Sequence, residues 1–300
     1  MNLSIVIPHF GDPAPTVALV ESLRPQLADA EIIVVDDCSV TPFGDLTGAH
    51  VVRRTRNGGF GATCNSGAGV AQGAYLLFLN SDLEVGPTFV DDLVSAAAPY
   101  QPCVASPRMI DDSGATAATA RAFPRTRHHV AAWLTPLARW RDTDAWHRAV
   151  GHDTATLRAT SIAATDWLVG AALLIPRPDF EAVGGFDERF YMNSEEIDLQ
   201  RRLRNRGLPA LWVPSVSVHH AGGGSSDATR RRAWLTASHL RYAEVWGNPS
   251  RLRVALTAAT LANLAWNAGR RALGREVHPL QTARDELALI HNTPTTGGAR

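Results

Sequence analysis

The stretch Tyr75-Leu76-Leu77-Phe78-Leu79-Asn80-Ser81-Asp82 indicates an apolar strand that ends in a carboxylate. Short apolar runs rich in aromatic and aliphatic residues are typical of buried strands. Ligands of open α/β sheets bind beyond the carboxyl ends of such strands. A carboxylate at this place can hold a divalent cation, and the cation can in turn hold a diphosphate.

A second stretch repeats the pattern earlier in the chain. Ile32-Ile33-Val34-Val35 is apolar and runs into Asp36-Asp37. Because Asp also favours the N-cap position of a helix, capping is the alternative explanation for either strand taken alone. Two strands that each bring an acid to the same sheet edge favour a nucleotide-diphosphate site.

Composition narrows the class of protein. Of the 300 residues, 45% are hydrophobic and 19% are charged, which predicts a globular protein of one large domain or two small ones. The formal net charge is zero, so charge gives no reason to expect a nucleic-acid partner. Cys38, Cys64 and Cys103 lack metal-ligand spacing, which favours reduced thiols in the cytosol. The first strand-like run begins at Leu3, so we expect no signal peptide and a cytoplasmic protein.

Strand-like and helix-like segments alternate from residue 3 to about residue 110. This alternation is typical of right-handed βαβ units, so we expect an α/β fold with a mainly parallel nucleotide-binding sheet flanked by helices. The predicted strands are 3–7, 32–35, 50–53, 75–79 and 103–106, and the predicted helices are 16–26, 60–71 and 88–98.

The second half of the chain is less regular. Residues 111–160 are rich in Ala, Thr, Arg and His and predict an irregular insertion with one or two helices around residues 130–150. Regular structure returns at about residue 165, with strand-like segments at 167–176 and 211–219, helices near 179–183 and 197–206, and a largely helical stretch over 228–290.

The segment Asn57-Gly58-Gly59-Phe60-Gly61 precedes a predicted helix, as a dinucleotide-binding loop would. The Gly-x-Gly-x-x-Gly pattern fails, however, because Cys64 takes the place of its third glycine. The chain contains no lysine, which also excludes a Walker P-loop. The helix N-terminus could still receive an anion or a nucleotide, and a plain tight turn is the alternative.

Glu195 and Glu196 open a predicted helix directly after Ser194. Ser194 as N-cap and acids in the first turn would stabilise this helix, which is the structural explanation. The functional explanation is a general base, which needs a carboxylate within hydrogen-bond reach of a hydroxyl. For Asp198 we expect a salt bridge to Arg201 or Arg202 within the helix.

Two histidines, His219 and His220, end the predicted strand 211–219 and are followed by Gly222-Gly223-Gly224-Ser225. A neutral imidazole at a strand end can bind a metal ion, and a polar loop histidine is the alternative. Together with Asp82, one of these histidines could complete a Mg²⁺ or Mn²⁺ site that also holds a diphosphate.

Taken in order, these segments resemble the inverting glycosyltransferases of family two, which have the GT-A fold. The resemblance covers about residues 3–226 and is strongest for the bacterial rhamnosyltransferase-type branch. Each motif is weak alone, but six in this order are specific. They are Ile5–Pro8, Val34–Ser39, Asn57–Gly61 with Asn65 and Gly67, Leu79–Asp82, Gly184–Phe190 and Glu195–Leu199.

The resemblance implies roles for individual residues. Glu196 matches the second acid of a Glu-Asp pair, the catalytic base, and its Glu for Asp change leaves Glu195 as the alternative. The divalent cation is assigned to Asp82 with His220 or His219, of which the spacing to Pro214 and Ser225 slightly favours His220. The implied nucleotide-binding residues are Pro8, Phe10, Asp36, Asp37, Asn57, Gly59, Asn65 and Asn80, and the implied acceptor-binding residues are Trp167, Gly170 and Asp187.

The implied reaction is a single in-line displacement. Glu196 would take the proton of an acceptor hydroxyl that attacks the anomeric carbon, while a cation on Asp82 neutralises the leaving diphosphate. The implied donor is a nucleotide-diphosphate sugar, dTDP-rhamnose first and UDP-sugars next, and the acceptor is a glycan or a polyprenyl-linked sugar. We expect a catalytic domain over residues 1–226, with a nucleotide-sugar half near 1–110 and an acceptor half near 160–226, and a helical extension over 227–300.

The C-terminal segment is basic. Residues 227–275 contain nine arginines against Asp227 and Glu244. The apolar stretch 254–269 is too short and too polar to span a bilayer. A helix lying on an anionic membrane surface, at the inner face of the cell membrane, is one interpretation, and a helix packed on the catalytic domain or on a partner subunit is the other.

Two other classes of function use a similar sheet. A sugar-phosphate nucleotidyltransferase needs a basic glycine-rich loop after its first strand, but the segment 8–13 contains neither Lys nor Arg. A non-catalytic protein that binds sugar nucleotides or glycans stays open, because the predicted base is Glu where the family has Asp.

Overall fold

The computed structural model describes residues 2–27, 30–220 and 228–292. The chain forms two compact units. Unit 1 comprises residues 1–121, 155–224 and 299, and unit 2 comprises residues 122–154, 225–298 and 300. Part of the middle insertion therefore belongs to the same unit as the C-terminal helices. The predicted boundary at 226/227 lies outside the described residues, and the functional division of the chain stays a prediction.

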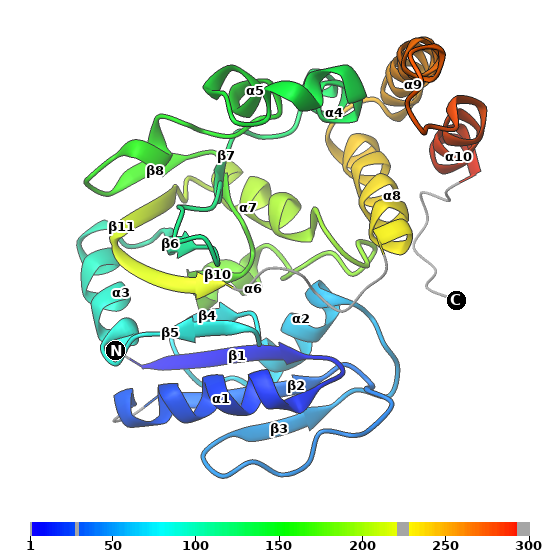
Figure 1. The fold of residues 1–300 in the computed structure, drawn as a ribbon. Coiled ribbons are helices and arrows are strands. Elements are labelled where there is room, and N and C mark those ends of the chain that lie inside the picture. The colour runs from blue at the N-terminus through cyan, green and yellow to red at the C-terminus, as the bar shows by residue number, and fades with distance from the viewer. Residues whose placement is uncertain (1, 28–29, 221–227, 293–300) are drawn as a thin grey trace. The chain divides into compact units, whose positions relative to one another are not determined.

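Unit 1 is built on a nine-stranded sheet (Figure 1). Its strand order is β3 (His50–Arg53), β2 (Glu31–Asp36), β1 (Leu3–His9), β4 (Tyr75–Leu79), β10 (Ala172–Pro176), β6 (Val104–Ile110), β11 (Ala210–His220) and β5 (Leu83–Val85), with β8 (Ala163–Thr165) paired to β11. A separate two-stranded sheet joins β7 (Ala120–Arg121) to β9 (Trp167–Leu168).

The sheet is mainly parallel, as predicted. Strands β1, β2, β3, β4, β6 and β11 run in one direction, and β5, β8 and β10 run against them. The antiparallel β10 lies between β4 and β6, a placement that periodicity does not reveal. The sequence analysis also did not predict the short strands β5, β7 and β8.

Helices cover both faces of this sheet. The first hydrophobic core contains Leu77 and Leu79 of β4 with residues of α1 (Pro13–Leu23) and α3 (Phe89–Ala97). The second contains Leu76 and Phe78 of the same strand with residues of α2 (Phe60–Val70), α6 (Arg177–Ala182) and α7 (Glu195–Asn205). Because successive strand residues point to opposite faces, a strand covered on both sides must be apolar throughout. This explains the unbroken apolar run in the sequence of β4.

Unit 2 is helical. It contains α4 (Thr126–Trp133), α5 (Asp144–Ala149), α8 (Ala228–Trp246), α9 (Pro249–Ala272) and α10 (Pro279–Asn292). Its small core joins Leu240, Leu252, Leu256 and Ile290 with Trp133. Short 3₁₀ turns complete the chain at Arg24–Gln26, Ala98–Tyr100, Thr135–Trp140 and Thr156–Arg158. The prediction of one or two helices around 130–150 and of a helical C-terminal segment is confirmed.

Candidate functional site

The carboxyl ends of β1, β2 and β4 share one edge of the sheet, because these three strands are parallel neighbours. Pro8 lies in β1 opposite Val35, and Phe10 follows β1 with 54% of its surface exposed. Asn80 follows β4 and donates its backbone N–H to the Ala171 carbonyl at 2.8 Å. An exposed aromatic ring at such an edge offers a stacking surface for a planar ligand.

Asp36 and Asp37 are both buried and both bind the chain itself. Asp36 accepts the backbone N–H groups of Ser39 at 2.8 Å and Phe43 at 3.0 Å and pairs with Arg53. Burial opposes ionisation, but the hydrogen bonds from Ser39 and Phe43, together with Arg53, hold the pKa of Asp36 below its usual value. Neither carboxylate therefore caps a helix, and their contact with a nucleotide stays a prediction.

Asp37 holds the glycine turn before α2 in place. Its carboxylate accepts the N–H groups of Gly58 at 2.9 Å and Gly59 at 2.8 Å. Gly59 has φ +83°, and a Cβ there would lie 1.7 Å from the Tyr191 carbonyl oxygen, so no larger residue fits. Asn57 accepts the Tyr191 hydroxyl at 2.8 Å. The turn thus links the nucleotide edge to the segment just before the acid pair.

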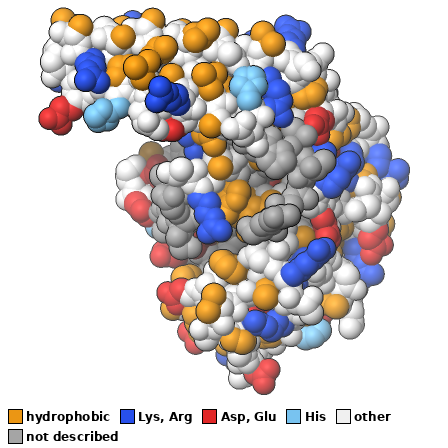
Figure 2. Space-filling view, turned by 90° about the vertical axis from the view of Figure 1, so that its right-hand side faces the viewer, with side chains coloured by type: hydrophobic (Ala, Val, Ile, Leu, Met, Phe, Trp, Pro, Cys, Tyr) orange, Lys and Arg blue, Asp and Glu red, His pale blue; other side chains and the backbone are white. Residues whose placement is uncertain are grey.

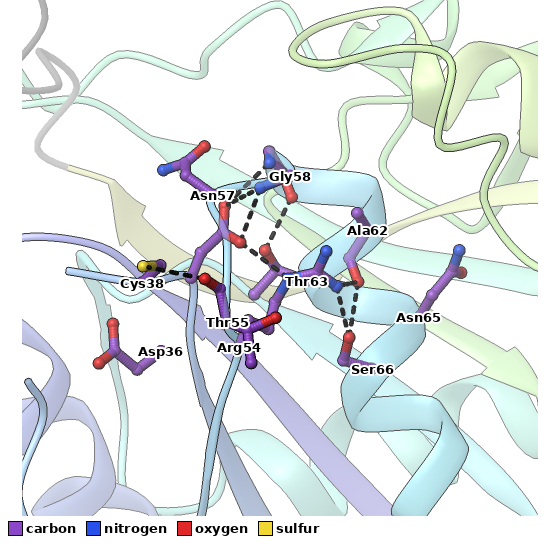
Figure 3. Close-up of polar contacts among 12 residues, drawn as sticks. Asp36, Cys38, Arg54, Thr55, Asn57, Gly58, Ala62, Thr63, Asn65 and Ser66 are labelled. Atoms are coloured by element: carbon purple, nitrogen blue, oxygen red, sulfur yellow. Dashed lines mark hydrogen bonds and ion pairs between the residues drawn. The ribbon is translucent and has the colours of Figure 1, made fainter. Parts of the chain in front are cut away.

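Asn65 lies on the other side of this turn from Asp36 (Figure 3). Its amide nitrogen donates to the Phe186 carbonyl at 2.9 Å, and its amide oxygen accepts the Phe186 N–H at 2.9 Å. The same nitrogen donates to Glu188 at 3.1 Å. In this structure Asn65 anchors the loop around residue 186, and its predicted nucleotide contact is not tested.

The side chains of the two candidate metal-binding histidines, His219 and His220, point in opposite directions. The Nε2 atom of His220 lies 3.3 Å from Oδ1 of Asp82. The hydrogen bond with Asp82 raises the pKa of His220 although burial lowers it, and the same bond lowers the pKa of Asp82. His219 points the other way, with its nitrogens 3.5 Å from Glu84 and 3.1 Å from Asp112. Adjacent strand residues face opposite sides, so only His220 meets the predicted acid.

The pair Asp82–His220 fits a Mg²⁺ or Mn²⁺ ion. Ligand atoms about 2.1 Å from one octahedral ion and at right angles to each other lie about 3 Å apart, close to the observed separation. A carboxylate oxygen with an imidazole nitrogen is also a donor set that Mn²⁺ accepts. Within the described ranges no group of three His, Cys, Asp or Glu side chains is poised to hold an ion.

Glu195 and Glu196 begin α7 after two residues with left-handed backbone, Asn193 at φ 70° and Ser194 at φ 67°. Ser194 takes the N-cap position, but its side chain makes no capping hydrogen bond. Such φ values in consecutive non-glycine residues are uncommon and cost energy, and they occur most at functional sites. The capping explanation for this turn is therefore wrong as regards the side chain of Ser194.

The environments of the two acids differ. Burial raises the pKa of Glu195 well above its usual value, and the neighbouring charge of Glu196 raises it further. Burial also raises the pKa of Glu196, but Arg121 opposes this rise. One oxygen of each carboxylate is buried without a hydrogen-bond partner. Two adjacent carboxyls oppose each other's ionisation, so one of Glu195 and Glu196 can hold a proton while the other acts as a base.

Arg121 is the functional residue that the sequence analysis missed. It lies in β7, paired with Trp167 of β9, and its guanidinium lies over the Trp167 ring at 5.5 Å. Its Nε donates to the Ala118 carbonyl at 2.8 Å. Because it comes from the irregular stretch 111–160, no periodicity or motif marks it. Only the pairing of β7 with β9 brings this cation toward Glu196.

The predicted acceptor residues lie at different distances from the acids. A Cβ at Gly170 would lie 3.2 Å from the Cβ of Glu196, so Gly170 faces the predicted base directly. Trp167 is buried, and Gln200 of α7 holds the next residue, Leu168, through hydrogen bonds of 2.8 and 2.7 Å. Asp187 binds the Arg189 guanidinium at 2.6 Å. The acceptor roles stay predictions.

The expected salt bridge of Asp198 is confirmed. Asp198 pairs with Arg202 at 2.6 Å, and Arg202 also donates to the carbonyls of Val183 and Gly185 at 2.7 Å each. This fixes α7 to the turn at Gly184-Gly185. Asp198 is therefore a structural residue and leaves Glu195 and Glu196 as the acids of the site. The predicted glycine run 222–224 and Ser225 lie outside the described residues.

Residues 4–165 match the model of Glycosyl transferase family 2, and the chain belongs to this family. It is 33% identical over 148 residues to N-acetylglucosaminyl-diphospho-decaprenol L-rhamnosyltransferase of Mycobacterium tuberculosis H37Rv, covering 49% of this chain and 46% of that protein. It is 26% identical over 243 residues to the O-antigen biosynthesis protein RfbC of Myxococcus xanthus, covering 76% and 18%. It is 34% identical over 79 residues to rhamnosyltransferase WbbL of Escherichia coli K12, covering 26% and 30%. The matches span about half of these relatives or less.

Solved structures show the same fold. The crystal structure of GalNAc-T7 with UDP, GalNAc and Mn²⁺ is similar with a TM-score of 0.61 and 18% identity, over 86% of this chain and 51% of that one. Staphylococcus aureus TarS is similar with a TM-score of 0.50 and 13% identity, over 87% and 49%. The predicted GT-A type of sheet, with helices on both faces and a helical C-terminal region, is thus confirmed.

Proposed function

We propose that this protein is an inverting glycosyltransferase that moves rhamnose from dTDP-rhamnose to a polyprenyl-linked acceptor in the assembly of a bacterial cell-envelope polysaccharide. The observation that carries the proposal is the acid pair at the start of α7, where burial raises the pKa of both Glu195 and Glu196 and Arg121 opposes the rise at Glu196. A binding protein has no need of such a pair, because buried carboxylates cost stability.

Glu196 is the base in this proposal. Burial raises its pKa, which makes it a better proton acceptor than an exposed Glu, and Arg121 opposes that rise. An acceptor hydroxyl next to Gly170 would pass its proton to Glu196 and attack the anomeric carbon from the side opposite the leaving diphosphate. This geometry needs no covalent enzyme intermediate and inverts the anomeric centre.

Asp82 and His220 would hold the divalent cation in this proposal. A bound Mg²⁺ or Mn²⁺ supplies positive charge for a leaving diphosphate. The exposed ring of Phe10, with Pro8 and Asn80 at the same sheet edge, is proposed to receive the nucleotide base and ribose. Small changes in such contacts select one nucleotide or sugar over another, so we take the choice of dTDP-rhamnose from the relatives.

The names of the relatives also support the proposed polyprenyl-linked acceptor. Two of them are named rhamnosyltransferases, and the name of the mycobacterial one specifies a decaprenol-linked diphosphate acceptor. No helix in the described part of the chain has the length and apolar character that crossing a bilayer requires. We propose that contact with a lipid-linked acceptor is peripheral, at the inner face of the cell membrane.

Helix α9 is the proposed membrane contact. Leu252, Leu256 and Asn263 face the interior of unit 2, whereas Val254 is 71% and Leu261 55% exposed. The exposed side has arginines at both helix ends. Figure 2 shows hydrophobic and arginine side chains mixed over the upper part of the view, where α9 and α10 lie. One face of α9 thus packs within unit 2, and the other face is proposed to lie on an anionic lipid surface.

The test is hydrolysis of a panel of nucleotide sugars with and without Mn²⁺ or Mg²⁺, followed by the released nucleoside diphosphate. We expect metal-dependent release from dTDP-rhamnose that is lost in Asp82→Ala. The matched control is Asp112→Ala, which removes an exposed acid beside His219 and should leave the release unchanged. Release from another donor would replace dTDP-rhamnose in the proposal. No release, together with no donor binding in calorimetry, would overturn it.

A further inference from the structure

Unit 2 contains a cavity of about 550 Å³ that belongs to none of the residues discussed above as catalytic. Segments of α4, α8, α9 and α10 and the stretch between α4 and α5 line it. Its volume is in the range of cavities that bind small organic ligands. The sequence analysis assigned no function to this part of the chain beyond the membrane contact.

A buried polar network holds the walls of this cavity in place. Asn263 of α9 accepts the Thr135 N–H at 2.8 Å and donates to the Trp133 carbonyl at 3.0 Å and to Glu286 at 3.3 Å. Glu286 of α10 is buried and pairs with Arg232 of α8 at 2.7 Å. The Arg232 guanidinium also lies over the Trp133 ring at 4.7 Å. Side chains from four segments are thus fixed to one another without a ligand.

The charges that remain in the cavity are positive. Glu286 is neutralised by Arg232. Arg141 and Arg270 also line the cavity, and in the described ranges neither has a carboxylate within ion-pair distance. Arg270 is half-buried and makes a hydrogen bond of 3.3 Å to Asn267. Arginine forks of this kind recognise phosphate groups, because they offer parallel N–H donors and a permanent charge.

The net charge of unit 2 as a whole is also positive. Unit 2 contains sixteen arginines and eight acidic residues, which gives +8, and unit 1 contains thirteen arginines and twenty-one acidic residues, which gives −8. The net charge of zero in the sequence is the sum of two opposite units. An anionic ligand is therefore attracted to unit 2 as a whole before it meets Arg141 and Arg270.

Apolar and aromatic side chains form much of the rest of the lining, beside polar residues such as Thr236 and Thr282. Trp146, Leu134, Leu256 and Val277 line the same cavity as the two arginines. A free phosphate would leave these surfaces in contact with water, whereas a phosphate ester of an apolar chain covers them and meets the arginines at the same time. The cavity therefore fits an amphiphilic anion better than an inorganic one.

We propose that this cavity binds the isoprenoid diphosphate part of a lipid-linked acceptor, with Arg141 and Arg270 on the diphosphate and the apolar lining on the first isoprene units. This inference rests on the proposed function for its choice of lipid. The cavity itself would make unit 2 the lipid-recognition unit of the protein, distinct in residues from the acid pair and from the Asp82–His220 pair.

The experiment is calorimetric titration of the full chain with farnesyl diphosphate below its micelle concentration. Inorganic diphosphate and farnesol are titrated separately. We expect farnesyl diphosphate to bind at least 10-fold more tightly than either fragment. Arg270→Gln should weaken it about 10-fold, which is about 1.4 kcal/mol. Arg271→Gln removes the same charge from the neighbouring exposed residue, which does not line the cavity, and should change binding by less than twofold.

A second pair of variants tests the cavity by volume. Thr282→Trp fills it from α10 and should abolish binding, whereas Gln281→Trp places the same ring on the adjacent exposed position and should not. Circular dichroism melting curves confirm that each variant folds. Absence of farnesyl diphosphate binding, equal binding of inorganic diphosphate or farnesol, or equal weakening by Arg270→Gln and Arg271→Gln would each overturn the inference.

Donor hydrolysis on the same preparations separates this inference from the proposed function. If farnesyl diphosphate does not bind but metal-dependent donor hydrolysis persists, only the lipid cavity is wrong. If farnesyl diphosphate binds as expected but no nucleotide sugar binds or reacts, the cavity stands and the glycosyltransferase proposal fails.

Discussion

The two units of this protein hold their charged groups in opposite ways. In unit 1 the proposed functional groups are acids at strand and helix ends, Asp82 after β4 and Glu195 and Glu196 at the start of α7. In unit 2 they are arginines around a helical cavity. Unit 1 carries −8 and unit 2 carries +8. A neutral sequence can thus contain an acidic unit suited to cations and proton transfer and a basic unit suited to anions.

The two units also differ in how burial affects their acidic side chains. In unit 1 burial raises the pKa of two adjacent acids, Glu195 and Glu196, and one oxygen of each lacks a hydrogen-bond partner. Such perturbed acids cost stability and are typical of functional sites. In unit 2 the buried acid Glu286 is paired with Arg232 and Asn263 and therefore serves structure. Changes to the acids of unit 1 should therefore alter the reaction and leave lipid binding intact.

The largest effect is expected for Glu196→Gln. Removing the general base should lower turnover about 10³-fold, while nucleotide-sugar binding and farnesyl diphosphate binding stay unchanged. Steady-state rates and calorimetry measure the three quantities. The control Glu181→Gln changes an exposed acid that pairs with Arg177 and should turn over normally. Normal turnover in Glu196→Gln would move the base to Glu195, whereas a wild-type protein that binds nucleotide sugars without any turnover would be a binding protein.

Gly59→Ala should cost about 3 kcal/mol of folding free energy, because the new Cβ collides with the Tyr191 carbonyl and the backbone has φ +83°. Urea denaturation followed by fluorescence gives the value. Gly114→Ala is the matched control, since Gly114 has φ +80° but open space around it, and should cost only about 1 kcal/mol. Equal costs at the two glycines would mean that the Tyr191 contact does not constrain the turn.

His220→Ala should reduce metal-dependent turnover about 10- to 100-fold and raise the Mn²⁺ concentration needed for half-maximal rate. His219→Ala changes the adjacent residue, which faces Glu84 and Asp112, and should do neither. Titration of the rate with Mn²⁺ distinguishes the two. If both histidines behave alike, the alternation along β11 does not decide the metal ligand.

The smallest effect is expected for stability against pH in Glu195→Gln. The pKa of Glu195 is raised in the folded chain, so its contribution to stability is complete below the unfolded pKa and is lost as pH rises through the folded pKa. The variant has no such loss, and each 1 kcal/mol recovered at high pH raises Tm by about 2–4 °C. Calorimetry between pH 5 and pH 9 measures it. A wild-type Tm that falls no faster with pH than that of the variant would contradict the raised pKa.

The sequence predicted the strands of unit 1 well for a physical reason. β4 begins and ends where expected, because a strand covered on both faces has an apolar run that polar or turn residues interrupt at its ends. The salt bridge of Asp198 with Arg202 was also predictable, since helix geometry alone places residues i and i+4 together. Local geometry was sufficient in both cases.

Long-range pairing decided what the sequence left open. The choice of His220 over His219 depends on β11 lying beside β5, and Arg121 reaches the acid pair only because β7 pairs with β9. The apparent capping role of Ser194 failed because its backbone is left-handed. The pairing partners of these strands lie far apart in the sequence, so no short segment contains them both.

By itself the sequence determined the α/β class, the order of the strands along the chain, and the residues that could perform the chemistry, because periodicity and residue type are local properties. Only the tertiary structure decided which acid and which histidine have suitable partners, and that residues 122–154 join the C-terminal helices around a basic cavity. Proton affinity and charge recognition depend on what is buried beside what, and burial is a property of the packed chain.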